Sequence, residues 1–349
     1  MTSLLRRAAP VDSTTDSSKR GTRVLFLVGA LLLLAVVYLL SLSVGARGIG
    51  FDEVWRLLWA PDGSEDSYVV HEMRMPRALL ALVVGAALGV SGALIQALTR
   101  NPLADTGILG VGAGASFAVV VGVAFFGVTA LSEYLWFAFG GAIAVTVLVY
   151  ALGSIGSIGA TPVRLTLVGV ALGALLGGFS SAITMLHPDS FEDTLRWSAG
   201  SLAGRGFATV ETVAIPIGVG LALGLVSGRP LNAISLGDDV AKSLGANVLR
   251  TRILVIVAVT LLAGAATAAA GPIGFVGLMV PHVVRWFTGP DQRWIIPFSA
   301  VGAALLLLAS DVLGRLLLAP QELEVGIVTA FLGAPVLILL ARRKKVSAL

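Results

Sequence analysis

Long apolar runs separated by short polar segments dominate this sequence. A helix needs roughly 20 apolar residues to cross about 30 Å of hydrocarbon, and most of the runs reach that length. No segments alternate with a period of two, so a barrel is excluded. The runs lie at residues 24–43, 78–98, 106–127, 134–153, 163–184, 208–227, 252–270, 272–286, 295–317 and 325–341. The pattern predicts an all-α integral membrane protein with about ten transmembrane helices, within a single domain over 23–345.

Two of the runs need separate interpretation. Run 272–286 is too short to cross alone, so we expect it to lean on protein or to re-enter. Run 24–43 has a basic flank like that of a signal peptide, but its apolar core is longer than the roughly 7–15 residues of signal cores. A retained span is favoured over a cleaved signal. Residues 1–22, rich in Ser, Thr and charge, are predicted to form a disordered cytoplasmic tail.

Composition narrows the functional class. The chain has 349 residues, of which 56% are hydrophobic and 13% charged, with a mean hydropathy of +0.94. Cysteine is absent, which excludes disulfides, thiol catalysis and cysteine-based metal sites. Although the pI is about 9.8, the basic residues are scattered at span ends instead of gathered on one face. Nucleic acid is therefore not a predicted partner, whereas membrane lipid is.

The basic residues also predict orientation. With a cytoplasmic N-terminus, 17 of the 24 basic residues lie on the inner side of ten spans. The positive-inside rule selects this arrangement, which places both termini in the cytoplasm. The seven basic residues left outside are Arg47, Arg56, Arg74, Arg77, Arg196, Arg205 and Arg315.

The longest outer segment, 44–77, contains an amphipathic pattern. Phe51, Val54, Trp55 and Leu58 recur at helical spacing, with acidic residues in the first turn. This pattern predicts a short helix lying on the outer surface. A second polar outer segment, 186–206, could hold another short helix.

The only sizeable inner loop, at about 228–251, has a pattern unusual for a linker. Ile234, Val240, Ala241 and Leu244 are apolar, and glycines stand at 237 and 245. The sequence predicts two short helices, broken at Gly237 and ended at Gly245. Because a plain surface loop does not need these apolar positions, we interpret the loop as a docking element for a cytoplasmic partner.

Small residues form a stripe in span 163–184. Gly169, Gly173 and Gly177 lie four apart and are followed by Ser180. Such stripes let helix backbones approach closely in lipid. Ordinary tight packing is one interpretation, and a translocation pathway or a subunit contact is the other.

Ionisable residues are nearly absent from the spans. Asp311 is the clear exception, and Arg315 lies four residues later on the same helix face. We interpret the two as a structural pair near the outer end. Ion-coupled secondary transport, the main rival function from another class, therefore lacks its usual relay residues.

Catalytic and cofactor signatures are also missing. The histidines at 71, 187 and 282 have no companions at ligand spacing, so no metal site is predicted, and His282 is expected at a helix end. No nucleotide-binding Gly-x-x-x-x-Gly-Lys-[Ser/Thr] motif or nucleophile–base pair occurs, so the chain is predicted to be neither an enzyme nor a cofactor protein. A weak similarity between 82–104 and 254–274, whose helices run in opposite directions, suggests an inverted repeat.

Motifs over about 70–342 resemble the FecCD-type permease family, the membrane subunits of type II ABC importers for ferric siderophores, haem and cobalamin. The motifs are Arg74-Met-Pro-Arg77, Ser91-Gly92-Ala93 through Gln96, Asn101-Pro102-Leu103-Ala104, Leu109-Gly110-Val111, the stretch 169–173, Arg229-Pro230-Leu231-Asn232, the stretch 271–278, Val280-Pro281-His282, Asp311 with Arg315, Gly326–Thr329 and Leu332–Pro335.

The resemblance implies an assembly in the bacterial cytoplasmic membrane. It consists of two ten-helix permeases, identical or paralogous, with two cytoplasmic ABC ATPase subunits and an extracytoplasmic substrate-binding protein. By resemblance, external arginines grip acidic residues of the binding protein, and coupling helices fit a cleft in the ATPase. The implied docking residues are Arg74, Arg77 and Arg315; the implied cytoplasmic gate is Asn101, Leu103 and Thr161; the implied coupling residues are Leu236, Gly237, Asp238, Asp239, Ala241, Leu244 and Gly245.

The resemblance also suggests the cargo. We expect a permease that translocates an iron–siderophore complex, powered by ATP hydrolysis in the partner subunits. Cobalamin and haem are the alternatives within the family. At the implied gate the chain has Thr161-Pro162-Val163, where the cobalamin importer has small hydroxyl residues.

Overall fold

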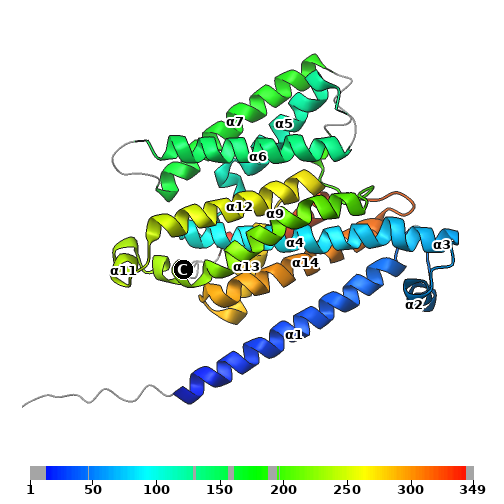
Figure 1. Cartoon of the computed structure of the whole chain (residues 1–349), viewed down its shortest axis with the longest axis horizontal. Helices are drawn as coiled ribbons and strands as arrows, with labels where there is room; N and C mark the ends of the chain where they lie inside the picture. The colour runs from blue at the N-terminus through cyan, green and yellow to red at the C-terminus, as the bar shows by residue number, and fades with distance from the viewer. Residues whose placement is uncertain are drawn as a thin grey trace, which may run out of the picture.

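A computed structural model describes residues 13–45, 47–128, 131–155, 161–187, 195 and 197–342. The described part of the chain is built from helices and connecting turns (Figure 1). Long helices are α1 (Ser13–Ser43), α4 (Met75–Thr99), α5 (Val111–Phe126), α6 (Leu131–Gly153), α7 (Pro162–Leu186), α9 (Phe207–Val226), α12 (Val248–Ala270), α13 (Val276–Thr288), α14 (Gln292–Leu317) and α15 (Val325–Arg342). Short elements are α2 (Phe51–Trp59), α3 (Glu65–Tyr68), the π-helix η1 (Val69–Arg74), the 3₁₀ helix η2 (Thr106–Leu109), α10 (Gly228–Ser235) and α11 (Asp238–Ser243).

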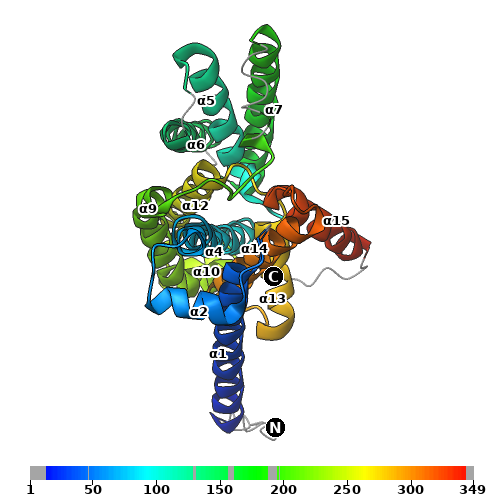
Figure 2. The same cartoon turned by 90° about the vertical axis from the view of Figure 1, so that its right-hand side faces the viewer.

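Helix α4 is the centre of the bundle. It packs against α9, α12, α13 and α14, which enclose it in the end-on view of Figure 2. Its small residues allow this close packing, because lipid supplies no hydrophobic force to bring helices together. A Cβ atom at Gly92 would overlap the carbonyl oxygen of Gly277 in α13, and one at Gly89 would overlap that of Ser299 in α14. The backbones of the central helices are therefore in direct contact.

The remaining long helices form the periphery. Helices α5, α6 and α7 lie together on one side of the core, and α1 extends from the opposite side (Figures 1 and 2). Only 6% of the apolar stretch of α1 is buried, and the same holds for α7. These helices expose apolar side chains over most of their length, as expected of surfaces that face lipid or another subunit.

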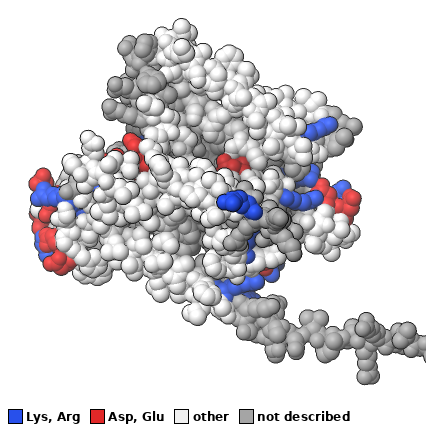
Figure 3. Space-filling model, turned by 180° about the vertical axis from the view of Figure 1, so that it is seen from behind, with Lys and Arg blue, Asp and Glu red and all other residues white. Residues whose placement is uncertain are grey.

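The two ends of the bundle differ from its middle. Figure 3 shows an uncharged surface over most of the middle, with Lys, Arg, Asp and Glu gathered toward the two ends. One end carries η1, the start of α4 and the end of α1; we call it the Arg74 end. The other carries the end of α4, α10, α11 and the start of α12; we call it the Asp238 end.

Each of the ten predicted spans corresponds to a helix in the described part of the chain. Seven helical segments there are long and apolar enough to cross a membrane, and two shorter apolar helices run over Val111–Phe126 and Val325–Leu339. The tenth, α13, has 13 residues, so it is about 20 Å long and cannot cross alone. It is buried against α4, α14 and α15, which confirms that run 272–286 leans on protein.

Three local predictions were wrong. Residues 13–22 were assigned to a disordered tail but extend α1, while residues 1–12 lie outside the described part. The run 106–127 is not one helix, because Gly110, with φ +68°, separates η2 from α5. His282 lies inside α13 instead of at a helix end, buried with its ring edge-on to Trp286.

The outer amphipathic helix and the two inner short helices are confirmed. Helix α2 spans Phe51–Trp59 and buries Val54 and Leu57, while its two tryptophans pack together on the exposed side. Helices α10 and α11 are separated at Gly237, whose φ is +111°, and α11 is followed by Gly245 at +82°. In the second outer segment, 186–206, residues 188–194 and 196 lie outside the described residues, and the short helix predicted there stays a prediction.

The suggested repeat agrees with the helix directions. Helices α4 and α12 pack side by side and run in opposite directions (Figure 1). Each ends at a residue with positive φ, Arg100 at +53° and Gly271 at +75°. Each is then followed by a proline-containing turn and a further helical element, η2 or α13.

Candidate functional site

Arg74 anchors the end of α1 at the Arg74 end of the bundle. The π-helix η1 delivers this side chain at the start of α4, and such segments recur at functional positions. Its guanidinium donates hydrogen bonds to the carbonyl oxygens of Leu42 at 2.7 Å and Ser43 at 3.0 Å, and to that of Arg47. Helix C-termini leave carbonyls without partners, and a cation stabilises that end of the helix dipole. Arg74 therefore acts as a cap for α1.

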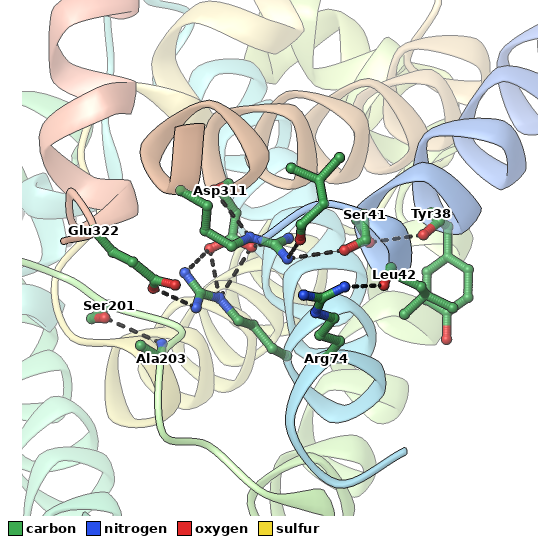
Figure 4. A network of polar contacts seen from close by, with 11 residues as sticks. Tyr38, Ser41, Leu42, Arg74, Ser201, Ala203, Asp311 and Glu322 are labelled. Atoms are coloured by element: carbon green, nitrogen blue, oxygen red, sulfur yellow. Dashed lines mark hydrogen bonds and ion pairs between the residues drawn. The ribbon is translucent and has the colours of Figure 1, made fainter. Parts of the chain in front are cut away.

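Arg315 caps the same helix end from α14. Its Nη1 donates to the carbonyl oxygens of Ser41 at 2.9 Å and Val44 at 2.8 Å. Its Nη2 forms an ion pair with Asp311 at 2.8 Å, which confirms the predicted pair on one helix face. Figure 4 shows these contacts converging where α1, α4 and α14 meet.

Asp311 also holds Arg77 across the helix interface, a contact that the sequence did not predict. The Nη2 atom of Arg77 lies 2.8 Å from one oxygen of Asp311, and its Nη1 lies 2.6 Å from Glu322. Asp311 is 1% exposed and serves two arginines, whereas Glu322 is partly exposed. The result is a buried network that joins α4 to α14 and, through Arg315, to α1.

The structure thus brings the three predicted docking arginines together at one end. It also gives each of them partners within the chain. Arg74 and Arg315 are buried, and Arg77 is nearly so. An external acidic residue would have to compete with backbone carbonyls, Asp311 or Glu322, and the docking role remains a prediction.

The predicted coupling segment divides into a buried and an exposed face. Ile234 and Ala241 are fully buried and form a small core with Val248. Leu236, Val240 and Leu244 are 64%, 45% and 65% exposed. Apolar side chains grouped on a surface mark contact sites for other proteins or for membrane. This segment therefore presents an apolar face at the Asp238 end.

Asp238 connects this segment to the transmembrane helices. One of its carboxylate oxygens pairs with Arg100, which follows α4, and the other accepts from Nη2 of Arg252 in α12 at 2.6 Å. The neighbouring Asp239 is fully exposed, and its ion-pair partner among the described residues is Lys242, at 3.7 Å. These ion pairs therefore link α11 directly to the end of α4 and to α12.

The predicted gate residues lie in two different turns. Asn101 and Leu103 share the turn after α4, where the Asn101 side-chain oxygen accepts from the Leu103 amide at 3.0 Å. Thr161 instead caps the start of α7, accepting from the Arg164 amide at 3.4 Å. Leu103 is exposed. Asn101 directly follows Arg100, so the first turn is adjacent to the Asp238 ion pairs.

The predicted small-residue stripe of α7 is used unequally. A Cβ atom at Gly169 would overlap the carbonyl oxygen of Ile108, so this part packs against η2. A Cβ atom at Gly173 would lie 3.7 Å from the Cβ of Ala113 in α5, which is an ordinary contact distance. Gly177 meets open space, and Ser180 is half-buried. Internal packing explains the part of the stripe with Gly169 and Gly173. The part with Gly177 and Ser180 stays open to a pathway or a second subunit.

Gln96 connects α4 to α13, a role that the sequence did not predict; the residue was named only as part of a family motif. Its side chain is fully buried and donates to the carbonyl oxygens of Gly277 at 3.2 Å and Leu278 at 3.0 Å. It also accepts from Arg285 at 2.8 Å. These bonds fix α13 against α4. A glutamine within an apolar run is the signal that could have indicated this role.

Comparison with known proteins identifies the family. The sequence pattern described as the FecCD transport family matches residues 32–343, which is most of the chain. The chain belongs to the FecCD transport family. It is thus a multi-span membrane permease of the ABC transporter class, and the resemblance drawn from the motifs is confirmed.

Individual relatives cover the permease almost completely. The ferric enterobactin transport system permease protein FepD of Escherichia coli is 47% identical, across 93% of this chain and 96% of the relative. The Fe(3+)-citrate import system permease protein YfmD of Bacillus subtilis is 42% identical, across 94% and 98%. The hemin transport system permease protein HmuU of Yersinia pestis is 37% identical, across 91% and 96%.

A solved structure also resembles this FecCD permease. It is a metal-chelate type ABC transporter in an inward-facing conformation, with a TM-score of 0.79 and 28% sequence identity, covering 90% of this chain and 98% of the other. The match confirms the all-helical architecture of an ABC importer permease.

Proposed function

We propose that this permease moves a ferric siderophore across the bacterial cytoplasmic membrane, driven by ATP hydrolysis in partner subunits. The observation that carries the proposal is the near-complete match to a ferric enterobactin permease at 47% identity. Relatives named for citrate and hemin are less identical, at 42% and 37%. Haem and cobalamin thus remain the alternative cargoes.

The proposed assembly contains two permeases, two ATPases and an external binding protein. The Asp238 end faces the cytoplasm in this proposal, because it carries most of the basic residues. Helix α1 ends and α15 begins at the Arg74 end, so both termini are cytoplasmic. The open part of α7, with Gly177 and Ser180, is the proposed pathway wall or contact with the second permease.

The apolar face formed by Leu236, Val240 and Leu244 is the proposed ATPase contact. When ATP draws the two ATPases together, α11 moves with them, and Asp238 pulls on Arg100 and Arg252. The turn with Asn101 and Leu103 follows Arg100 directly, so the same movement opens or closes the cytoplasmic gate. The permease forms a pathway that alternates between outward-facing and inward-facing states, and it carries out no chemical step.

External docking is proposed for Arg74, Arg77 and Arg315. Charge-assisted bonds from arginine to carboxylate are directional and strong. Arg77 is the most accessible of the three, because its bond to Glu322 faces the surface. An acidic residue of the binding protein would take the place of Glu322 at this arginine.

A reconstitution experiment tests this function. The permease, its ATPase and its binding protein would be placed in liposomes and supplied with ferric enterobactin, ferric citrate, haem or cobalamin. We expect ATP-dependent uptake that is fastest for the ferric siderophore. Uptake by the permease alone, driven by a proton or sodium gradient, would instead support a secondary transporter.

The role of Asp238 in coupling is a separate prediction. Asp238→Asn removes the charge that both Arg100 and Arg252 contact, and partly exposed ion pairs of this kind are worth up to about 1 kcal/mol each. We expect the cargo moved per ATP hydrolysed to fall about tenfold, which corresponds to about 1.4 kcal/mol, while the ATPase stays bound.

Asp52→Asn is the matched control, because that side chain is exposed and lies on α2, away from the coupling segment. It should leave the transport ratio unchanged. Parallel measurement of ATP hydrolysis and uptake in liposomes decides the matter. Equal ratios in both variants would contradict the transmission route through Asp238.

A further inference from the structure

A groove of about 360 Å³ runs between α6 and α12, which lie side by side (Figure 1); we call it the α6–α12 groove. Its walls are residues of α6 between 143 and 151 and residues of α12 between 253 and 261, in the halves of both helices near the Asp238 end. At about 1.5 Å per residue, each wall is about 12 Å long. One leaflet supplies about half of the roughly 30 Å of hydrocarbon, so the groove matches the depth of a single leaflet.

The walls of the α6–α12 groove are apolar. Thr146 and Thr260 line it, but each hydroxyl donates to a carbonyl oxygen of its own helix at 2.8 Å. Apart from these threonines and Tyr150, every lining side chain is aliphatic. Val147 and Val257 are 62% and 43% exposed, so the groove is open to its surroundings. A hydrocarbon chain fits such walls, whereas a polar ligand would lose its hydrogen bonds to water there.

Two arginines stand at the Asp238 end of this groove. Arg250 lies in the first turn of α12, three residues before Ile253 and seven before Val257, so it shares the helix face that lines the groove. Arg164 reaches the end of α6, where its Nη1 donates to the carbonyl oxygen of Ile155 at 3.0 Å. One arginine thus lies beyond each wall.

The two helix ends adjoin, and neither arginine is neutralised. Tyr150 of α6 and Arg252 of α12 line one smaller hollow that continues the groove. Arg252 pairs with Asp238. Within the described residues no carboxylate pairs with Arg164 or Arg250, and the exposed Arg250 side chain has no hydrogen-bond partner there. The groove therefore ends at a positive rim with no internal counter-charge.

We propose that the α6–α12 groove binds an anionic phospholipid of the leaflet at the Asp238 end, with an acyl chain along the walls and the phosphate between Arg164 and Arg250. Basic pockets between transmembrane helices bind anionic headgroups, because arginine at the membrane surface attracts the lipid phosphate. A helix of another subunit fits poorly: it is about 10 Å wide, so 12 Å of its length occupies on the order of 900 Å³. The inference does not depend on which cargo the permease carries.

The test titrates the detergent-purified permease–ATPase complex with phosphatidylglycerol and, separately, with phosphatidylcholine that carries the same acyl chains. Native mass spectrometry counts the bound lipids. We expect phosphatidylglycerol to bind the parent more tightly. Arg164→Gln and Arg250→Gln should each weaken its binding about fivefold, which corresponds to about 1 kcal/mol per basic residue, and together about 25-fold. Phosphatidylcholine, which has no net charge, should bind the parent and these variants equally.

Matched controls separate the groove from general surface charge and from damage to the fold. Arg229 is also exposed at the Asp238 end but lies on α10 outside the groove, so Arg229→Gln should leave phosphatidylglycerol binding unchanged. Val257→Trp should fill the groove and weaken binding of both lipids at least tenfold. Leu225→Trp is its control, because Leu225 is 57% exposed on α9 and does not line the groove. All these variants should melt at the temperature of the parent, since no fully buried side chain is changed.

Several results would overturn the inference. One is equal phosphatidylglycerol affinity in the parent and in the double variant of Arg164 and Arg250; others are equal affinity of the parent for the two lipids and unchanged binding in Val257→Trp. Loss of the ATPase from Arg250→Gln with unchanged lipid binding would assign this arginine to the ATPase contact. Disulfide cross-linking of Val257→Cys between two permeases would assign the groove to a second copy of this chain. The proposed function survives each of these results, because lipid binding is measured without cargo.

Discussion

Replacing Asp311 with alanine should destabilise the folded permease by about 3–5 kcal/mol, the loss expected when a buried ion pair is broken from one side. Asp311 is 1% exposed and neutralises both Arg77 and Arg315. Without it, two buried guanidinium groups lose their common carboxylate, and α4 is no longer joined to α14 by charge. Denaturant unfolding in detergent micelles, followed by helix content, measures the effect.

Glu322→Gln provides the matched control for this variant. Glu322 contacts Arg77 as well, at 2.6 Å, but it is about one-third exposed. Partly exposed pairs contribute less than about 1 kcal/mol, so this variant should stay close to the parent. A triple variant with Asp311→Leu, Arg77→Met and Arg315→Met should recover much of the loss, because apolar packing can replace a buried ionic network. If Asp311→Ala is no less stable than Glu322→Gln, the network does not hold these helices together.

Gly92→Val should prevent the central helices from packing. The added Cβ would overlap the carbonyl oxygen of Gly277, which belongs to the backbone of α13 and cannot rotate away. Overpacking a core with extra side-chain atoms costs about 1–3 kcal/mol. A clash with backbone should reach or exceed the upper end of that range, because α13 has to shift as a whole.

The matched control for Gly92 is Gly218 in α9. A Cβ atom there would meet nothing within 4 Å, although the residue also lies inside an apolar helix. Gly218→Val should therefore give the same yield of folded permease as the parent, whereas Gly92→Val should give little. Size-exclusion profiles and thermal unfolding of both variants in detergent compare them directly. Similar profiles would contradict the close approach of α4 and α13.

Much of the architecture could be predicted because the apolar runs in this chain are long and well separated. Each predicted span contains a helix. The shortness of run 272–286 correctly indicated a helix that packs against protein instead of crossing the membrane alone. The glycine positions at 237 and 245 predicted the two short inner helices, because positive φ favours glycine. In contrast, the break at Gly110 was missed, since the residues on both sides of it are apolar.

The candidate site was less predictable, because it depends on contacts between distant segments. The pair of Asp311 and Arg315 follows from helical spacing, but Arg77 reaches the same carboxylate from a position 234 residues earlier in the chain. Exposure separated the roles of Ile234 and Leu236, which are equally apolar in the sequence.

The grip of Arg74 and Arg315 on the last carbonyls of α1 has a thermodynamic consequence. Only 6% of the apolar stretch of the first helix is buried. Attachment of this helix and binding of an outside ligand to Arg74 or Arg315 compete for the same hydrogen bonds. Thermodynamic linkage makes this competition reciprocal. A ligand that binds either guanidinium weakens the attachment of the helix, and detachment of the helix strengthens binding of that ligand by the same factor. Faster hydrogen exchange of the backbone amides near Leu42 would then report that a ligand has bound to these arginines at the outer end of the permease.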